Sequence, residues 1–504
     1  MHDQYGGSNE PQPRRSTFNV SAQKKTTWDE SELVPIYWDF LYPGEVRRGT
    51  TRAFIRLSNP LDFPLMDNAY ITIHVFSCAI RNVWDNFRKF FGERQSPADS
   101  IDYTLPKYGT GNVALNGNSD GQKLADHLGL PHVASFDQSD AHALPFRVYR
   151  KIWNYWYRDS SIQASIAESS DDGPDNGPTE HVIEFRGKRW DYFTNVTPNP
   201  QRGESVMIGG EVEYAYGQGD LPGVYAVGES DYKRLDANAA TVDISATSSN
   251  QANALYPNTT INELRNAVAI QQFLERDNRA GQLFGDLITA HYGVAFNDAK
   301  YAPVFIAGGS APFVFSPIAN AAQSVGEELG ELGSIGLSTF EGASFTYRAE
   351  EPEIIMVIAS VSADLTYHQG LDRKWSYNTR YDFVYPEFEG IGDQSLLKKE
   401  LYYQNTSTDD EVFGYSPRYE EARVGINTLS GEFRPDNALS LDTWHLAQDF
   451  AAAPILNDAF IQSSPPFARV LKSATNSQFI GDFQCEQYST KALSQRGIPG
   501  MARL

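Results

Sequence analysis

The most informative stretch of the chain reads Phe63-Pro64-Leu65-Met66-Asp67-Asn68, then Tyr70-Ile71-Thr72-Ile73-His74-Val75-Phe76, and soon afterwards Arg81-Asn82-Val83-Trp84-Asp85-Asn86-Phe87-Arg88-Lys89-Phe90-Phe91-Gly92-Glu93. Its middle part alternates in a way that predicts a β-strand. In the last part Asn82 can cap a helix and Gly92 can end one, and apolar residues recur between them at helical spacing. The stretch therefore predicts a turn, a strand and a compact aromatic helix in close succession.

Composition favours a β-rich fold with many turns. The chain has 504 residues, of which 41% are hydrophobic and 13% aromatic, and it contains 39 Gly and 27 Pro. Frequent Gly and Pro favour many short elements over long helices. Length alone suggests about three domains, but a β-rich fold with long insertions can form one large unit. Abundant aromatic side chains suit broad interfaces between proteins.

Charge and cysteine content exclude several classes. The net charge is −22, so the overall field of the protein repels polyphosphates. Any contact with nucleic acid therefore requires a local basic patch or a separate basic partner. Two cysteines, Cys78 and Cys485, cannot form a disulfide framework, which indicates synthesis in a reducing cytoplasm. The sequence also predicts no signal peptide and no membrane span.

Further elements follow from periodicity and local signals. Strands are predicted at 53–57, 353–361 and 381–386, and the unbroken apolar run at 354–359 indicates a strand covered on both faces. Helices are predicted at 144–159, with Pro145 near the start, and from a capping box at Thr260–Glu263 onward. Residues 105–143 and 168–179 are predicted to be loops, and residues 1–20 a mobile arm.

Residues 201–260 have a different composition from the rest of the chain. They contain eight Asp or Glu (204, 211, 213, 220, 229, 231, 236, 243) against three Lys or Arg (202, 233, 234). Small polar residues dominate, and no strong amphipathic period is present. Residues 210–258 are therefore predicted to form an acidic insertion that faces solvent.

The ordered blocks together resemble one known family. Beyond the opening stretch, similar segments include Leu144–Arg147, Asp191–Thr194, Gly431–Arg434 and Leu441–Phe450. The chain resembles the major capsid proteins of the Microviridae, the small single-stranded-DNA bacteriophages, and most closely their gokushovirus-like branch. The motif residues that carry this resemblance are Pro64, Met66, Asp67, Asn68, Trp84, Asp85, Asn86, Pro145, Phe146, Trp153, Trp444, His445, Gln448, Asp449, Pro499 and Gly500.

The resemblance implies a mainly β structure, an eight-stranded antiparallel jelly roll of viral capsid type with long inserted loops and several short helices. Residues 21–504 would form this single domain. In such capsids an insertion like 210–258 forms protrusions at the three-fold axes, and the modest length here suggests a small one. The implied function is structural, without enzymatic activity, catalytic residue, metal or cofactor.

The implied particle is a T=1 icosahedral shell of about 60 copies around a circular single-stranded DNA genome. The chain would belong to the virion and assemble in the cytoplasm of the bacterial host. Implied partners are a small basic DNA-binding protein, an internal scaffolding protein, a DNA pilot protein and a host-cell surface receptor. Arg14, Arg15, Lys24 and Lys25 are predicted to contact DNA, although these charges could equally serve only to solvate a tail. Residues 210–258 are the candidate receptor surface.

Other site hypotheses have weaker support. His127, His132 and His142 are close in sequence, but their polar loop contains no cysteine and no zinc motif. Residues 116–121 and 171–177 resemble calcium loops without the complete ligand pattern. Cys78 fits a core position, and the acids Asp382, Glu387 and Glu389 show no pairing.

One alternative remains open from the residues. A carbohydrate-binding or carbohydrate-active β-rich protein would also have abundant aromatic and acidic side chains. It predicts a monomer with one deep groove, whereas the capsid interpretation predicts a symmetric assembly. The alternative accounts for the composition but leaves the ordered motif blocks unexplained.

Overall fold

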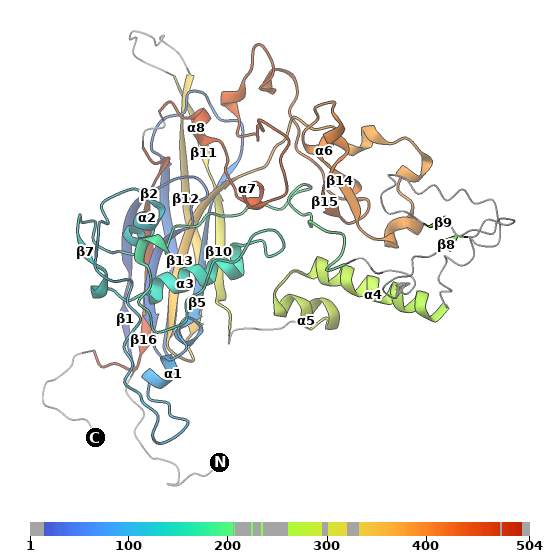
Figure 1. Cartoon of the computed structure of the whole chain (residues 1–504). Helices are drawn as coiled ribbons and strands as arrows, with labels where there is room; N and C mark the ends of the chain where they lie inside the picture. The colour runs from blue at the N-terminus through green and yellow to red at the C-terminus, as the bar shows by residue number, and fades with distance from the viewer. Residues whose placement is uncertain are drawn as a thin grey trace, which may run out of the picture. The chain divides into compact units, whose positions relative to one another are not determined.

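The protein is described by a computed structural model that covers residues 15–204, 206, 223–224, 233–234, 261–294, 301–319, 332–473 and 476–495. Two compact units are present, one formed by residues 1–200 with 281–504, and the other by 201–280. Figure 1 shows that strands dominate the first unit. No helix among the described residues is both long and apolar enough to cross a membrane.

Two antiparallel sheets form the body of the first unit. The larger sheet has the order β1-β16-β4-β12-β11, and β2 also pairs with β16. Its strands are β1 (Ser16–Asn19), β2 (Ala22–Trp28), β4 (Val46–Leu57), β11 (Val314–Ala319), β12 (Leu332–Arg348) and β16 (Phe479–Lys491). The smaller sheet has the order β10-β5-β13-β3. Its strands are β3 (Val34–Leu41), β5 (Ala69–Ala79), β10 (Val304–Pro312) and β13 (Glu353–Ala363).

The two sheets share one hydrophobic core. Residues of the larger sheet such as Ile55, Phe340 and Phe483 belong to the same buried cluster as Ile73 and Met356 of the smaller sheet. In β4, β12 and β16 buried and exposed residues largely alternate, so the larger sheet buries one face. In β13 every residue is buried, so the smaller sheet is covered on both faces at its centre.

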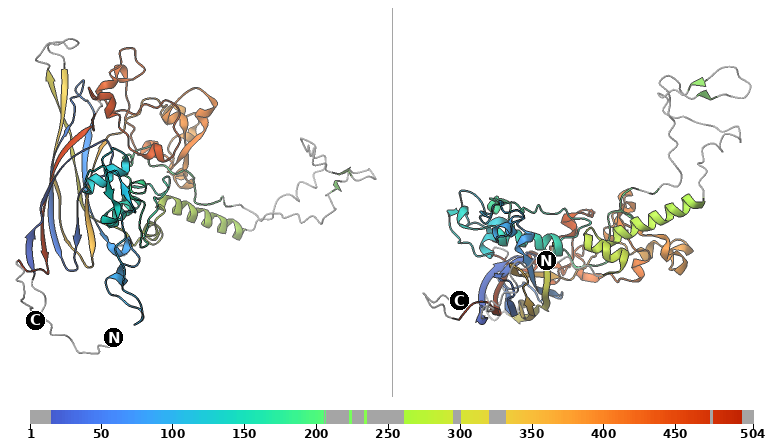
Figure 2. Two further views of the ribbon diagram at one scale, coloured as in Figure 1. Left: turned by 60° about the vertical axis from the view of Figure 1, so that its left-hand side comes forward. Right: turned by 90° about the horizontal axis from the view of Figure 1, so that it is seen from below.

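Two long insertions follow strands of the smaller sheet, and the first of them covers the second face of that sheet. The first joins β5 to β10, and its helix α3 (Leu144–Ile152) contacts β5 and β13, while α2 (Asp120–His127) contacts β3. The second joins β13 to β16, and its residues Tyr367 and Phe413 form a small separate core together with Phe193 of the first insertion. Within the first unit, Figure 2 shows the inserted segments on one side of the strands. One face of the larger sheet is therefore left open.

The remaining elements are short. In the first unit they are α1 (Phe87–Phe90), α5 (Phe284–Tyr292), α6 (Lys398–Leu401), α7 (Asp458–Ile461), α8 (Phe467–Val470) and two strand pairs, β6 (Asn112–Val113) with β7 (Phe136–Asp137) and β14 (Gln394–Leu397) with β15 (Val412–Ser416). The second unit contains α4 (Ile261–Ala280) and the pair β8 (Gly223–Val224) with β9 (Lys233–Arg234). Single 3-10 turns connect many of these segments.

Most sequence-predicted elements are confirmed. β4 and β5 contain the predicted strands, β13 is fully buried as its apolar run indicated, and α4 begins directly after Thr260. Helix α3 begins at Leu144 with Pro145 in its first turn, and five residues of π-helix extend it to Tyr157. The prediction of a mainly β protein with short helices is confirmed. Among the described residues the two main sheets contain ten strands, and the eight-stranded jelly roll stays a prediction.

Four local predictions are wrong. The predicted aromatic helix is reduced to α1, because Asp85 N–H donates to Ser170 O and Trp84 Nε1 donates to Asp172, which holds the preceding residues in an irregular turn. Residues 381–386 form turns, since Asp382 accepts the N–H groups of Asn378 and Thr379. Helix α2 lies in a predicted loop. Ser16–Asn19 pair with β16, so the predicted arm extends no further than Arg15.

Candidate functional site

A buried arginine joins the two sheets. Arg47 lies at an inward position of β4, where its guanidinium donates to Asp39 of β3 at 2.8 Å and to Glu45 at 3.0 Å. The same group also donates to Tyr37 Oη and Gln487 Oε1, both at 3.1 Å. These partners use four of the five donors that a guanidinium offers. The cluster therefore ties one end of β3 to the larger sheet.

A second buried arginine fixes the first insertion. Arg147 of α3 donates to Asp175 through Nε at 3.0 Å and through Nη2 at 2.5 Å, and to the carbonyl oxygen of Val83 at 3.2 Å. His181 contacts the same carboxylate at 2.9 Å. Burial alone would raise the pKa of Asp175, but hydrogen bonds from His181 and Arg147 hold its pKa below the usual value.

Asp175, Glu180 and His181 are close enough together to be considered as metal ligands. Both oxygens of Asp175 already accept from Arg147, and Glu180 is paired with Arg150. A cation would have to displace two guanidinium groups from these carboxylates. The donor set therefore fits an internal ion-pair cluster better than a metal centre.

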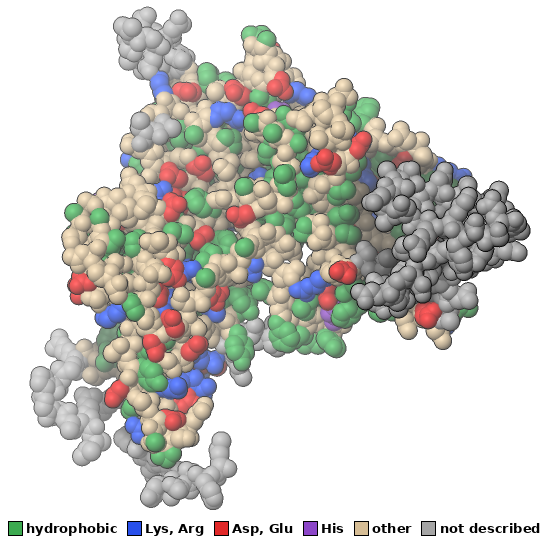
Figure 3. All heavy atoms as spheres, in the orientation of Figure 1, with side chains coloured by type: hydrophobic (Ala, Val, Ile, Leu, Met, Phe, Trp, Pro, Cys, Tyr) green, Lys and Arg blue, Asp and Glu red, His purple; other side chains and the backbone are tan. Residues whose placement is uncertain are grey.

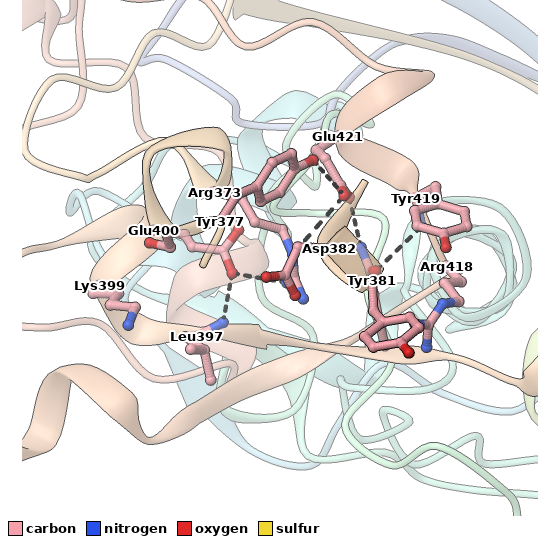
Figure 4. A pocket seen from close by; sticks show the side chains of 12 residues that line it. Arg373, Tyr377, Tyr381, Asp382, Leu397, Lys399, Glu400, Arg418, Tyr419 and Glu421 are labelled. Carbon is pink, nitrogen blue, oxygen red and sulfur yellow. Dashed lines mark hydrogen bonds and ion pairs between the residues drawn. The ribbon is translucent and has the colours of Figure 1, made fainter. Parts of the chain in front are cut away.

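A pocket of about 200 Å³ opens beside the small second core (Figure 4). Arg373 lies between two carboxylates, 3.1 Å from Glu400 and 4.0 Å from Glu421. Tyr377 and Gln394 donate to Glu421 at 3.1 and 2.7 Å, and Tyr192 donates to Glu400 at 2.8 Å. Burial raises the pKa of Glu400, against the hydrogen bond from Leu397 N–H.

Glu400 and Glu421 in this pocket act as hydrogen-bond acceptors for neighbouring side chains. Each of the two carboxylates takes bonds from a tyrosine and lies beside the same arginine. General acid–base work requires a carboxyl group free to exchange a proton with a bound substrate. In the described part of the chain, the two carboxylates instead hold neighbouring loop segments together.

The first group of family-motif residues anchors the second insertion. Met66 N–H donates to Trp444 O at 2.8 Å, and Asp67 accepts from Leu446 N–H at 2.9 Å. Asn68 Nδ2 donates to Asp364 at 3.1 Å. Pro64 lies in the same connection, and Phe63 beside it stacks on Trp444 with ring centroids 5.3 Å apart. The opening motif and the 444–449 motif, far apart in sequence, therefore meet in space.

The remaining residues of the 444–449 motif continue this attachment. His445 Nε2 contacts Phe433 O at 2.8 Å, and Gln448 N–H donates to Thr366 O at 3.0 Å. Asp449 accepts from Gln369 at 2.9 Å. These contacts join the motif to the chain that follows β13.

The second group of motif residues anchors the first insertion. Trp84 and Asn86 both donate to Asp172, at 2.7 and 3.1 Å, and Asp85 accepts from Ser170 at 2.9 Å. In α3, Pro145 and Phe146 are buried, and Trp153 just after α3 donates to Phe185 O at 3.1 Å. Pro499 and Gly500 lie outside the described residues. The described motif residues thus hold insertions in place, and no reaction centre is formed by them.

The predicted DNA-contact residues separate into different environments. Arg14 lies outside the described residues, and Arg15 donates to Gly44 O at 2.5 Å. Lys24 points inward from β2 and donates to Pro35 O at 2.9 Å, and burial lowers its pKa to about 8. Lys25, the next residue, is exposed. Alternation along a strand explains why neighbouring lysines have opposite surroundings.

The candidate histidines and Cys78 are also placed. His127 is buried beside Thr26 Oγ1, whereas His142 packs against Trp38 and Phe40. Within the described part of the chain, His127, His132 and His142 do not come together as a set of metal ligands. Cys78 is buried in β5, and burial raises the pKa of its thiol to about 12.

Sequence reasoning did not identify Arg47, Arg147 or Arg373. A local signal existed for Arg47, because it shares the inward parity of Ala53, Ile55 and Leu57 in β4. Arg147 and Arg373 meet their carboxylates across 28 and 27 residues. The periodicity of a single helix or strand cannot predict ion pairs between residues so far apart in the sequence.

Comparison with known proteins identifies the family. A family model described as capsid protein (F protein) matches residues 9–501. The chain belongs to this family of capsid proteins. The capsid protein VP1 of Bdellovibrio phage phiMH2K is 32% identical over 96% of this chain and 95% of its own length. VP1 of Chlamydia phage 1 is 29% identical and VP1 of Spiroplasma virus 4 is 26% identical, each over 97% of this chain and 96% of the relative.

Family membership confirms the resemblance to the Microviridae major capsid proteins. The capsid protein is a structural protein of the virion, and the family implies self-assembly into a shell. The comparisons give no support to the carbohydrate-binding alternative. The buried clusters around Arg147 and Arg373 are therefore interpreted as contacts that hold the inserted loops of a shell subunit, and the Arg47 cluster as a link between its two sheets.

Proposed function

We propose that about 60 copies of this capsid protein form a closed T=1 icosahedral shell around a circular single-stranded DNA genome. The subunit body is proposed to be a jelly roll. Its support is the strand order: if β2, β3, β4, β5, β10, β12, β13 and β16 are numbered one to eight along the chain, the sheets read 1-8-3-6 and 2-7-4-5. Two Greek keys folded into facing sheets have this kind of order.

Contacts between copies are proposed to come mainly from the insertions. A shell subunit needs several different self-contacts at once, and large exposed aromatic side chains supply much of the energy of such interfaces. The second insertion carries several of them close together in sequence: Trp375, Tyr381, Phe383 and Tyr385. They lie in a turn-rich segment and leave 39–81% of their surface exposed, which supports a role against a neighbouring copy.

The proposed partners follow from charge and from the family. A protein with a net charge of −22 gains little from its overall field when it encloses DNA, so a small basic DNA-binding protein is proposed inside the shell. An internal scaffolding protein and a DNA pilot protein are proposed during assembly in the cytoplasm of the bacterial host. Residues 210–258, which apart from 223–224 and 233–234 lie outside the described residues, are proposed to form a small protrusion at the three-fold axis and to contact the host receptor.

The decisive experiment is the mass and shape of the native particle. Sixty copies of 56.2 kDa give about 3.4 MDa of protein. Electron microscopy and light scattering of material from the native source should show uniform spheres whose protein shell has this mass. Native particles with a different copy number, or only a 56.2 kDa monomer in native material, would contradict the proposal.

A further inference from the structure

The larger sheet has one face that the inserted segments do not cover. Outward positions alternate along its strands, for example Arg48, Arg52, Phe54 and Arg56 on β4 and Gln484 and Tyr488 on β16. Figure 2 shows the inserted segments of the first unit on the other side of the strands. A wide surface of fixed geometry is therefore available for a partner outside the subunit.

The charge balance of this face is the reverse of that of the whole chain. The chain has 42 Lys or Arg against 64 Asp or Glu. The outward positions of β2, β4, β12 and β16 carry five cations, Lys25, Arg48, Arg52, Arg56 and Arg348, against three anions, Glu341, Asp482 and Glu486. By contrast, acidic and basic side chains are interspersed over the face drawn in Figure 3. A local excess of arginine on an acidic protein suits a polyanion.

Most of these cations have no acidic partner. Arg52 is paired with Glu341 at 3.0 Å and with Glu486 at 2.6 Å. Within the described residues, no ion pair joins Lys25, Arg48 or Arg56 to a carboxylate. Arg48 and Arg56 lie eight residues apart on one strand, a separation of about 27 Å. This spacing presents free guanidinium groups along a line, which suits the backbone of an extended chain of phosphates.

Aromatic side chains lie beside these arginines. Tyr488 of β16 is the direct cross-strand neighbour of Arg48 and is 49% exposed. Phe54, between Arg52 and Arg56 on the same face, is 51% exposed. A shallow hollow of about 370 Å³ is lined by Arg48, Tyr488, Thr50, Thr346, Ser344, Gly49, Phe345 and Glu486. A cation, a ring and hydroxyl groups around one hollow provide contacts for phosphate, base and sugar.

We propose that the open face of the larger sheet binds single-stranded nucleic acid, with Arg48 and Arg56 holding phosphates and Tyr488 stacking on a base in the hollow beside Arg48. This inference rests on the proposed genome-enclosing function and names the surface that would face the genome. It requires no motion of the sheet, since the side chains project from paired strands. Single-stranded DNA is favoured over duplex because stacking on Tyr488 needs an unpaired base.

The test is binding of a labelled 20-nucleotide oligothymidylate to the full-length, unassembled protein, followed by fluorescence anisotropy in about 50 mM salt. Arg48→Ala should weaken binding because a phosphate contact is lost. Tyr488→Ala should weaken binding roughly tenfold because one stacked base is lost. Tyr488→Phe should bind like the unmodified protein, since the ring remains. Removal of Arg48 should also lower the slope of log affinity against log salt by about 0.7.

Matched controls separate this surface from general effects. Tyr403 is 50% exposed, close to the value for Tyr488, and lies in the second insertion, so Tyr403→Ala should not change affinity. Arg434→Ala removes an exposed arginine from the second insertion, so it should also leave the affinity unchanged. Glu486→Gln removes an anion from the edge of the hollow and releases one partner of Arg52, so it should tighten binding. A gain of affinity cannot result from poor folding.

Two outcomes would overturn the inference. One is that the unmodified protein does not bind the oligonucleotide. The other is that the Arg48, Tyr488 and Glu486 variants bind it with the same affinity as the control variants. Assembly is scored separately by electron microscopy. Particles of the expected size with unchanged affinity for all variants would remove this nucleic-acid surface but leave the shell intact. Failure of the unmodified native protein to form particles would instead contradict the proposed function.

Discussion

The two sheets of this capsid protein are built from similar strands but have different surroundings. β13 in the smaller sheet is buried at every position, whereas β4 in the larger sheet alternates between buried and exposed residues. The difference arises because the first insertion lies over the smaller sheet, where α3 contacts β5 and β13 and α2 contacts β3. The first insertion therefore converts one sheet into an interior layer and leaves the other with a free face.

The arginines of the buried layer and of the open face also differ in their pairing. Arg147, within the first insertion, is buried and paired with Asp175, whereas Arg48 and Arg56 on the open face have no carboxylate partner among the described residues. A buried arginine must be paired because an isolated charge is costly to remove from water. An exposed arginine carries no such cost and remains available to a partner. The two environments thus assign the same residue type to different roles.

The largest expected effect comes from breaking the insertion anchor. Arg147→Ala leaves Asp175 buried without its main partner, so we expect a loss of about 3–5 kcal/mol in the free energy of unfolding. Chemical denaturation of the unassembled protein, followed by tryptophan fluorescence, measures this. Arg52→Ala on the open face is the matched control and should leave the midpoint unchanged. Equal sensitivity at the two arginines would remove the distinction between the sheets.

A second test uses the parity of strand positions. Ile354 and Ile355 point to opposite faces of β13 and are both fully buried, so replacing either by Ala should cost about 2–5 kcal/mol. On β12, Phe340→Ala should cost about 3–5 kcal/mol, whereas Leu337→Ala, at a position that is 36% exposed, should cost less than about 1.5 kcal/mol. The four variants are compared by denaturant midpoint. A mild effect at either isoleucine would show that one face of β13 is poorly covered.

The smallest expected effect is a pH dependence of folding stability that arises from Glu184 in the first insertion. Burial raises the pKa of Glu184, in the first insertion, to about 7 from an ordinary value of 4.5. The unfolded chain therefore loses this proton first, and folded stability falls as pH rises from about 4.5 to 7. Glu184→Gln removes this dependence and should be the more stable protein at pH 8, by on the order of 1–2 kcal/mol after allowance for partial exposure.

Unfolding free energies of both proteins, measured at pH 5 and pH 8, provide the check. The difference between them should be small at pH 5 and larger at pH 8. An equal difference at both values would mean that Glu184 is ionised throughout this range in the folded protein.

The sequence by itself determined the family and much of the local structure. The apolar run at 354–359 predicted a strand covered on both faces, and every residue of β13 is buried, including the polar residues Glu353, Ser360 and Ser362 that flank this run. The period of residues 144–152 predicted α3, since one apolar stripe must meet a core. The ordered motif blocks predicted a capsid protein, because they keep their order along nearly the whole chain.

Only the tertiary structure decided which residues meet. Trp84 and Asp85 have helical periodicity, but their bonds to Asp172 and Ser170 overrode it. Lys24 and Lys25 look alike in sequence, yet pairing of β2 with β16 turned one inward and left the other exposed. Arg147 pairs with Asp175, which lies 28 residues further along the same insertion. Local patterns record the preference of a segment for a face or a period, whereas its partners depend on strand order and on contacts made over long separations.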